Sequence, residues 1–425
     1  MLWFGCFATA SRALSRNHAR EETEMKHNWK LPAALLCAIL LFGCAQGGAA
    51  GASSVPAASA PAPSSAQTAP ENGLEPVSSS VLADLERRAA ALADLCRPWL
   101  AGQQAGDAGA LRAALEEAGE PVLVPEHSGV SALSGAPDAF AAFRQAALSG
   151  QNARLEAVSA AESGHVYLVS YYLEDSGAFC AQARLEYDET GAAHPGGPGQ
   201  TDIENWQFTE KGNLIFELAL SPLHEDGHSM LRAQPVPQAF QDAAAQYLDT
   251  VGYRDNDLFS KNWQAGDMGD VCLNDAFDAM TRLATGQDYS PAGSAAPSFV
   301  PAEAFEQALC QYLPVTPSQL RAQAGYDAEA GGYPYLPYGV AYWAVLPEMA
   351  PEVTSVQEHA DGTLTLAVDV ACMRRGTDRL FTHELTVQPG GDGTFRFLSN
   401  RIVWQDGARM PQYHTRLSGY EATAA

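Results

Sequence analysis

The hydrophobic period of this chain changes from that of helices to that of strands, and this order constrains the fold more than any other feature. Apolar residues recur at helical spacing from Val81 to Leu100, behind serines suited to capping a helix. Two further helices are expected near 107–118 and 137–148. Four runs rich in β-branched and aromatic residues follow, near 165–173, 181–187, 203–208 and 214–220. The first half therefore predicts helices packed on a sheet.

The same order returns after Pro235. Helices are expected near 237–250, 271–285, 302–312 and 317–323, and strands near 353–359, 363–373, 379–388 and 394–404. Asp361-Gly362 and Asp392-Gly393 favour tight turns between the last strands. Together the halves predict an α+β protein of two lobes, 79–235 and 236–425, each with helices packed on an antiparallel β-sheet. A duplication and two unrelated α+β lobes both fit this order.

A short basic segment, 25–30, leads into the apolar run 31–42 near the start of the chain. The run is shorter than the roughly 18–20 residues that a membrane-spanning helix needs, so it predicts a signal peptide. It ends in Leu41-Phe42-Gly43-Cys44, which resembles the lipobox of bacterial lipoproteins, although Phe42 is bulkier than the residue usual there. The resemblance implies that 25–44 is a lipoprotein signal peptide. It also implies that Cys44 is lipidated, with palmitate as an expected acyl chain, and begins the mature protein.

The segments on either side of this signal are not expected to fold. Residues 1–24 have no role in such a signal and are interpreted as a non-native extension, with Met25 as the true start. Residues 45–78 consist almost wholly of Ala, Gly, Ser, Pro, Gln and Thr, which cannot bury enough apolar surface to become ordered. They predict a flexible tether. The protein is therefore expected to be exported and held on the membrane through its lipid anchor, facing outward.

The charge of the chain excludes one class of partner. The net charge is −25 at pH 7, from 50 acidic and 25 basic residues. Nucleic acids require clustered Lys and Arg, so they are not expected as partners. The cysteines are widely spaced after Cys44 and form no C-x-x-C pair, which argues against zinc, haem or thioredoxin chemistry. No cofactor and no metal ion is predicted.

Two stretches of the C-terminal part share motifs with a known group of proteins. The first runs from Pro301 to Tyr335 and includes Tyr333-Pro334-Tyr335; the second is 353–402 and includes Asp361-Gly362-Thr363. From Pro301 onward the chain thus resembles a C-terminal segment of uncharacterised bacterial lipoproteins. That group has no assigned function, so the resemblance supports the lipoprotein prediction and adds no chemistry.

Residues His224-Glu225-Asp226-Gly227-His228 match the H-E-x-x-H pattern by which many metallopeptidases hold zinc. In such a site the two histidines share one face of a helix. Gly in a helix interior costs about 1 kcal/mol relative to Ala, and Asp-Gly is a strong hairpin signal. The pattern is therefore interpreted as a turn, with a zinc-dependent peptidase as the alternative.

The stretch 331–343 carries several aromatic residues on a Pro-stiffened, non-helical segment. Rings held in this way can stack on sugars or contact peptides at low entropic cost. The residues assigned to such a ligand-binding surface are Tyr333, Tyr335, Tyr338 and Trp343. The competing interpretation is that the rings are buried and join the helices to the sheet.

Two other groups have a structural and a functional interpretation. The acid-rich loop Asp255-Asn256-Asp257 lacks the regular spacing and central glycine of a calcium loop, so a solvated loop or a helix cap is favoured. His383 falls on the apolar face of its expected strand, which is typical of a hydrogen-bonded core residue. A metal or acid–base role is the alternative for His383.

The sequence favours a non-catalytic binding or interaction protein at the cell envelope, because it contains no phosphate-binding loop and no nucleophile elbow. The ligand is expected to be an envelope protein, a peptide or a glycan, held by the aromatic stretch 331–343 or by a cleft between the lobes. The competing class is an envelope hydrolase, or a zinc-dependent peptidase that uses His224, Glu225 and His228.

Overall fold

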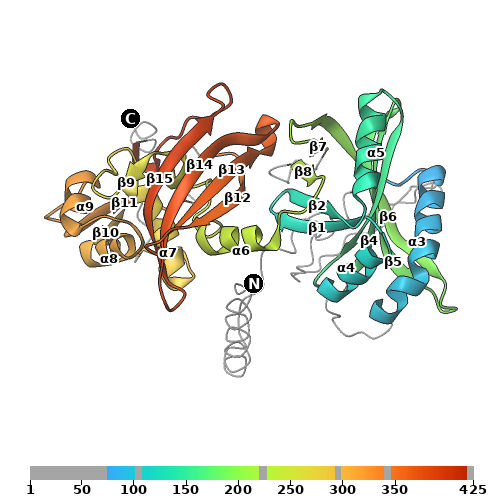
Figure 1. Cartoon of the computed structure of the whole chain (residues 1–425), viewed down its shortest axis with the longest axis horizontal. Helices are drawn as coiled ribbons and strands as arrows, with labels where there is room; N and C mark the ends of the chain where they lie inside the picture. Colours follow the sequence, from blue (N-terminus) through green and yellow to red (C-terminus); the bar gives the residue numbers. More distant parts are fainter. Residues whose placement is uncertain (1–73, 101–107, 220–226, 292–297, 339–345, 419–425) are drawn as a thin grey trace, which may run out of the picture.

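The computed structural model describes residues 74–100, 108–219, 227–291, 298–338 and 346–418. Within these ranges the protein is a mixed α+β structure with a closed eight-stranded barrel, a five-stranded sheet and a two-stranded sheet. The barrel and the five-stranded sheet form two bodies that lie beside each other, each with its own helices (Figure 1). We name residues 79–232 the barrel lobe and residues 238–418 the sheet lobe.

The barrel lobe begins with helices and continues mainly in strands. Its helices are α3 (Ser79–Leu100), α4 (Ala108–Glu117) and α5 (Pro137–Leu148). Its strands are β1 (Val122–His127), β2 (Val130–Ser134), β3 (Ala153–Ala160), β4 (Val166–Glu174), β5 (Gly177–Tyr187), β6 (Ala193–Phe208), β7 (Leu214–Leu218) and β8 (His228–Arg232). The three helices and β4 to β7 lie where the hydrophobic period predicts them. The prediction lacks β1, β2, β3 and β8.

The barrel closes through two parallel strand pairs. Its order is β1-β2-β8-β7-β6-β5-β4-β3, and β1 pairs with β3 to complete the circle. The pairs β1–β3 and β2–β8 are parallel, with Val122 opposite Val158 and Val130 opposite Met230. The expectation of a purely antiparallel sheet is therefore wrong for this lobe. Strands that are parallel need a long connection, and α5 lies in the connection from β2 to β3.

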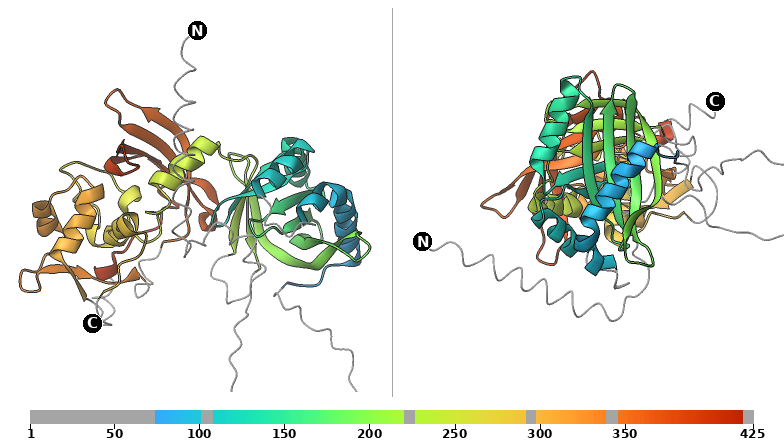
Figure 2. Two further views of the ribbon diagram at one scale, coloured as in Figure 1. Left: turned by 90° about the horizontal axis from the view of Figure 1, so that it is seen from below. Right: turned by 90° about the vertical axis from the view of Figure 1, so that its right-hand side faces the viewer.

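Side chains from all eight strands meet in one apolar cluster inside the barrel. Its members include Leu123, Leu133, Leu155, Val169, Cys180, Ile203, Phe216 and Leu231, with Phe140 and Phe143 of α5 among them. The opposite face of β3, β4 and β5 is covered by α3 and α4. Figure 2 shows α3 lying across the outside of the strands. Alternate residues of these strands therefore enter two separate cores.

The sheet lobe also places helices before its long strands. Its helices are α6 (Gln238–Tyr247), α7 (Leu273–Thr285), α8 (Ala302–Tyr312) and α9 (Pro317–Gln323). Its strands are β9 (Trp263–Gln264), β10 (Ser298–Pro301), β11 (Gly332–Tyr335), β12 (Ala350–Glu358), β13 (Leu364–Cys372), β14 (Thr377–Pro389) and β15 (Phe395–Gln405). The five-stranded sheet is antiparallel in the order β12-β13-β14-β15-β9. The four helices and four long strands lie where they are predicted. The open sheet differs from the closed barrel.

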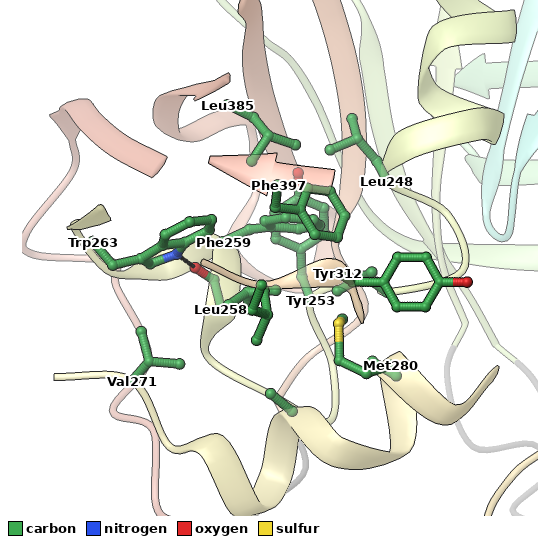
Figure 3. Close-up of a cluster of buried hydrophobic side chains, with 14 of the residues drawn as sticks. Leu248, Tyr253, Leu258, Phe259, Trp263, Val271, Met280, Tyr312, Leu385 and Phe397 are labelled. Atoms are coloured by element: carbon green, nitrogen blue, oxygen red, sulfur yellow. Dashed lines mark hydrogen bonds between the residues drawn. The ribbon is translucent and has the colours of Figure 1, made fainter. Parts of the chain in front are cut away.

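Aromatic side chains fill the core between the helices and this sheet. The ring of Phe259 packs against Tyr253 in a tilted arrangement at a centroid distance of 5.5 Å and edge to face against Phe397 at 5.6 Å (Figure 3). The indole nitrogen of Trp263 donates a hydrogen bond to the carbonyl of Leu258 at 2.7 Å, so this buried polar group is satisfied. Met280 of α7 and Leu385 of β14 complete the contact.

The predicted hairpin turns of the sheet lobe are confirmed. Gly362 and Gly393 have φ angles of 78° and 83°, a left-handed conformation that glycine adopts without a Cβ penalty. The preceding Asp361 and Asp392 each accept a hydrogen bond from the backbone N–H of the threonine two residues later, at 3.1 Å. These turns connect β12 to β13 and β14 to β15 and fix the register of those two pairs.

A buried arginine fixes the C-terminal segment to α7. Arg416 is 1% exposed, and its Nε and Nη1 donate to Asp275 and Asp278 at 3.0 and 2.6 Å. Nη1 also donates to the carbonyl of Leu336 at 3.0 Å, and Nη2 to that of Asp275 at 2.6 Å. The hydroxyl of Tyr413 donates to Asp275 at 2.6 Å. The last described residues are therefore part of the folded lobe.

Candidate ligand-binding groove between the lobes

The outer face of barrel strands β2, β7 and β8 packs against the sheet lobe. One apolar cluster joins Val130, Ile215 and Met230 of the barrel to Ala350, Ala371 and Met373 of the sheet lobe. All six residues are at most 4% exposed. We name this contact the junction. Because it removes apolar surface from water, the junction holds the lobes together in addition to the chain that links them.

Charged and polar contacts surround the apolar cluster of the junction. Arg232 is 2% exposed; its Nε lies 2.9 Å from Oε2 of Glu126, and its Nη1 donates to Glu352 of the sheet lobe. Lys211 of the barrel lobe lies 3.0 Å from Glu352 and 2.8 Å from Asp369 of the sheet lobe. The contacts of Arg232 and Lys211 with Glu352 and Asp369 favour one arrangement of the lobes, since they join charges from both sides.

Burial at the junction favours neutral side chains. It raises the pKa of Glu126, although the positive charge of Arg232 acts in the opposite direction. It also lowers the pKa of His127, whose Nδ1 lies 3.9 Å from Asp249 of the sheet lobe. The junction is therefore a poorly hydrated contact and not only a set of surface ion pairs.

A hollow of about 430 Å³ opens at one side of the junction. One wall comes from β6, β7 and β8 through Asn205, Trp206, Gln207, Ile215, Phe216, Glu217 and His228. The other wall is the turn of the sheet lobe that holds Met373, Arg374, Arg375 and Gly376. We name this hollow the junction groove. Its volume lies within the range of small-molecule sites, roughly 300–1,000 Å³, which often occur between domains.

The turn that forms the second wall is held by both lobes. Met373 is 2% exposed and belongs to the apolar cluster of the junction. Gly376 has a φ angle of 64°, and its carbonyl accepts a hydrogen bond from Nε2 of Gln207 in the barrel lobe at 2.8 Å. Arg374 and Arg375 lie between these two fixed residues and are exposed. Their guanidinium groups are thus presented to the groove from an ordered turn.

His228 and Glu217 lie opposite each other on the paired strands β7 and β8. Nε2 of His228 lies 3.7 Å from Oε1 of Glu217, which is longer than a hydrogen bond. Asn205 donates to Oε2 of Glu217 at 2.8 Å and orients that carboxylate. The groove therefore offers hydrogen-bonding groups, two cations and one imidazole.

The H-E-x-x-H pattern does not form the helical zinc site of a peptidase. His224, Glu225 and Asp226 lie outside the described residues. The carbonyl of Gly227 accepts a hydrogen bond from the N–H of Leu218 at 3.0 Å, and His228 begins strand β8. A residue in a strand cannot share a helix face with the residue four positions earlier. In the part of the chain that the structure describes, no group of three His, Cys, Asp or Glu could hold a metal ion.

Two of the four aromatic residues assigned to a ligand belong to the core. Tyr333 and Tyr335 are 0% and 3% exposed, and their hydroxyls donate to Glu306 and Asp278, both at 2.9 Å. Their assignment to a binding surface is therefore wrong. The physical reason is that β11 turns both rings toward α7 and α8, where Tyr333 stacks on Phe305 at 4.1 Å.

The other two residues of the aromatic stretch have different positions. Tyr338 is half-buried beside a hollow of about 670 Å³, with the guanidinium of Arg254 6.0 Å from its ring centre. Trp343 lies outside the described residues. Of the four residues assigned to a ligand, Tyr338 is therefore the one that the described part of this stretch leaves partly exposed.

The acid-rich loop is a buried segment. Asp255, Asn256 and Asp257 are 8%, 2% and 3% exposed. The side chain of Asn256 accepts from the N–H of Leu258 at 3.1 Å, and that of Asp257 accepts from the N–H of Cys272, just before α7, at 3.0 Å. Burial raises the pKa of Asp257 to about 6. The solvated-loop interpretation is therefore wrong; the loop is buried, and neither Asp257 nor Cys272 caps the helix that follows it with its own side chain.

His383 is a hydrogen-bonded core residue, as its position in the strand pattern predicts. It is 0% exposed. The side-chain amide of Asn400 donates to the carbonyls of Phe259 and Lys261, so its oxygen accepts from Nδ1 of His383 at 2.6 Å. Nε2 then accepts from the hydroxyl of Tyr253 at 2.8 Å. Burial lowers the pKa of His383 to about 4, so the imidazole is neutral near pH 7.

The sequence analysis does not predict most of the residues that line the groove. Its residues come from β6, β7, β8 and the turn after β13, and the contact from Gln207 to Gly376 joins positions 169 residues apart. No spacing rule connects such positions. The one available sequence signal is the pair Arg374-Arg375, two adjacent cations in a chain with twice as many acidic as basic residues.

A family model described as "Family of unknown function (DUF6070)" matches residues 104–416. The match includes α4, the barrel, the sheet lobe as far as Arg416 and every residue that lines the junction groove. It therefore extends further toward the N-terminus than the resemblance seen from Pro301. Comparisons with curated proteins and with solved structures found no match. None of the described helices is long and apolar enough to span a membrane.

Proposed function

Because this chain belongs to the DUF6070 family, whose function is unknown, we propose a function from its own residues: it is a lipid-anchored binding protein of the cell envelope, and the junction groove holds its ligand. One observation carries the proposal. Both lobes line a single polar hollow of small-molecule size at a contact that is fixed by buried apolar and charged residues. A rigid groove loses little entropy when a ligand binds, which favours affinity.

The anchor rests on the N-terminal sequence. A basic segment, an apolar run, Cys44 and a tether of small and polar residues follow one another in the order of a lipoprotein signal. The expected result is that cells expressing the full chain incorporate labelled palmitate into it and that Cys44→Ser abolishes the label. Equal labelling of both proteins would remove the anchor from the proposal and leave the groove unaffected.

The lining of the groove favours binding over covalent catalysis. None of the lining residues that the structure describes is a serine, threonine or cysteine, so the groove presents no side chain of the usual nucleophile types. Asn205, Gln207 and Glu217 instead supply hydrogen-bonding groups, and Trp206 is 39% exposed at its edge. Polar groups of this kind beside an aromatic residue are suited to recognition.

A hydrolase is the second candidate, and the approach of His228 to Glu217 favours it. An imidazole at 3.7 Å from a carboxylate can act as a general base toward water. We expect no turnover when the full chain is incubated with fluorescently labelled cell-wall glycan and peptide fragments. Turnover that disappears in His228→Gln while binding persists would make the protein a hydrolase.

The binding proposal is tested by capture of envelope fragments with the full chain. Small soluble glycans and peptides are screened for binding, and the affinity of each hit is measured for wild type and Trp206→Ala. The matched control is Trp404→Ala, because Trp404 is exposed to 42%, close to the 39% of Trp206, but does not line the groove. We expect at least a tenfold loss in Trp206→Ala and no change in Trp404→Ala. Equal effects of the two substitutions would place the ligand elsewhere.

We also propose that the two lobes arose by duplication of one helix-then-strand unit. Both begin with helices and continue mainly in strands, and each has a long strand, β6 or β15, that ends near an exposed tryptophan followed by glutamine, Trp206-Gln207 and Trp404-Gln405. On this proposal, the barrel has more strands than the open sheet because β1, β2, β3 and β8 have no long equivalent in the sheet lobe. A solved relative with two equal sheets would support this origin.

A further inference from the structure

We propose that the ligand of the junction groove carries an anionic group, a carboxylate or a phosphate, which Arg374 and Arg375 bind. The inference rests on the proposed function of the groove and adds the chemical class of its ligand. It starts from the contrast between the groove and the rest of the chain, whose net charge is −25.

The groove has the opposite balance of charge. Its lining contains two guanidinium groups and one carboxylate, that of Glu217. Glu217 accepts a hydrogen bond from Asn205 and lies nearest to His228. Arg374 has an interaction within the protein, whereas Arg375 forms no ion pair within the described ranges. An acidic protein that displays two adjacent arginines in a hollow attracts an anion there and repels it from most of its remaining surface.

The geometry of the turn favours arginine as the recognising group. Met373 and Gly376 fix the two ends of the turn, through the apolar cluster and the hydrogen bond from Gln207. A Cβ at position 376 would lie 2.0 Å from Nε2 of Gln207, so this close contact depends on glycine. A guanidinium presents its donors in a planar fork that matches carboxylate and phosphate oxygens. Holding the turn reduces the entropy that such a contact would otherwise cost.

The remaining lining limits the ligand to a molecule of modest size with polar and apolar surfaces. The groove has a volume of about 430 Å³ and includes Ile215, Phe216 and Trp206 beside Asn205 and Gln207. A sugar acid or a sugar phosphate has this combination, because one face of a sugar ring is apolar and its edge carries hydroxyls.

Saturation-transfer NMR on the full chain tests the inference with two matched pairs of sugars. Galacturonate is compared with galactose, and glucose 6-phosphate with glucose, so that each pair differs by the anionic group. We expect the acidic member of at least one pair to bind at least tenfold more tightly than its neutral partner. The pair that shows the larger difference identifies carboxylate or phosphate. Raising the salt from 0.02 to 0.3 M should weaken only the acidic member, because screening acts on the charge.

The decisive variant is the double substitution Arg374→Gln/Arg375→Gln, which should remove the preference for the acidic sugar. The matched control is Arg379→Gln. Arg379 lies at the start of β14, just after the turn that holds Arg374 and Arg375, and its side chain is 44% exposed but does not line the groove. An intact preference in the double variant, equal affinities within both pairs, or no binding of any of the four sugars would overturn the inference. If Trp206→Ala still lowers sugar binding while the arginine variant does not, the groove remains the binding site and only its charge recognition is rejected. If neither substitution matters, both proposals fail.

Discussion

Arg416 and Arg232 are both buried arginines, but one lies inside the sheet lobe and the other lies between the lobes. Arg416 is 1% exposed, and each of its side-chain nitrogens donates a hydrogen bond to Asp275, Asp278 or a backbone carbonyl. Arg232 is 2% exposed, yet its Nε and Nη2 have no hydrogen-bond partner among the described residues. Its Nε lies 2.9 Å from Oε2 of Glu126 in a geometry that does not form a hydrogen bond.

The two sites differ in how many of the arginine's hydrogen bonds to water are replaced by hydrogen bonds within the protein. A buried charge is costly unless its partners replace all the water that it loses, and the interior of the sheet lobe meets that condition for Arg416. At the junction, Arg232 keeps an ionic contact with Glu352 but leaves two of its nitrogens without a hydrogen bond within the described ranges. The lobe interiors should therefore be more stable than the contact between them.

Arg416→Ala should give the largest loss of stability. The substitution leaves two buried carboxylates, Asp275 and Asp278, without their cation, and breaking a buried ion pair in this way typically costs about 3–5 kcal/mol. Urea unfolding of the full chain measures the free energy, and hydrogen exchange locates it. We expect amides of α7 and of the C-terminal segment to lose protection before those of the barrel.

The control for this substitution is Arg409→Ala. Arg409 pairs with Asp406 at 3.0 Å but is 53% exposed, and exposed pairs contribute only about 0–1 kcal/mol. A loss in Arg416→Ala as small as that of the control would show that the buried cluster does not stabilise the sheet lobe.

Acidification should destabilise the sheet lobe through His383. Folding lowers the pKa of His383 from the usual 6.5 to about 4, so between these values the unfolded chain binds a proton that the folded chain does not. Stability is therefore present above pH 6.5 and is lost as the pH falls toward 4, by about 3 kcal/mol in all. At the junction the sign is opposite, because burial raises the pKa of Glu126 and the folded state there binds its proton more readily as the pH falls.

The pH dependence of unfolding for wild type and His383→Gln separates this contribution from that of the other titrating groups. Glutamine does not titrate, so the stability of the variant should fall less steeply between pH 6.5 and 4. Parallel curves for the two proteins would contradict the assignment of His383 as a neutral core residue.

Arg232→Met should give the smallest of the three effects, about 1–2 kcal/mol. Two of the side-chain nitrogens of Arg232 already lack hydrogen bonds, and the pKa of Glu126 is raised, so this carboxyl can take up a proton once the cation is absent. Small-angle X-ray scattering of the full chain should show a wider spread of lobe arrangements at unchanged helix and strand content. A cost equal to that of Arg416→Ala would show that the junction is as stable as the lobe interior.

The sequence predicts the long elements well because their hydrophobic periods are local. Alternation over 363–373 and 379–388 together with the Asp-Gly turns is enough to place β13 and β14. The four missed strands of the barrel give weaker signals: β2 has five residues, two of them serines, and β1 contains Pro125. Their pairing comes from partners far along the chain, β3 and β8, which no local pattern shows.

The aromatic stretch and the groove show that the sequence alone does not predict which residues form a binding site. Tyr333 and Tyr338 are similar in sequence context, but only the first is fully buried, since burial depends on whether α8 lies against the ring. The sequence by itself determines the helix-then-strand order, the hairpin turns, the core position of His383 and the acidic charge, because each depends on neighbouring residues. The tertiary structure alone decides the closure of the barrel and brings Glu217, His228, Arg374 and Arg375 into one hollow. The physical reason is that both depend on contacts between residues distant in the sequence: closure pairs β1 with β3 and β2 with β8, and the groove needs contacts between lobes such as that of Gln207 with Gly376, 169 positions apart.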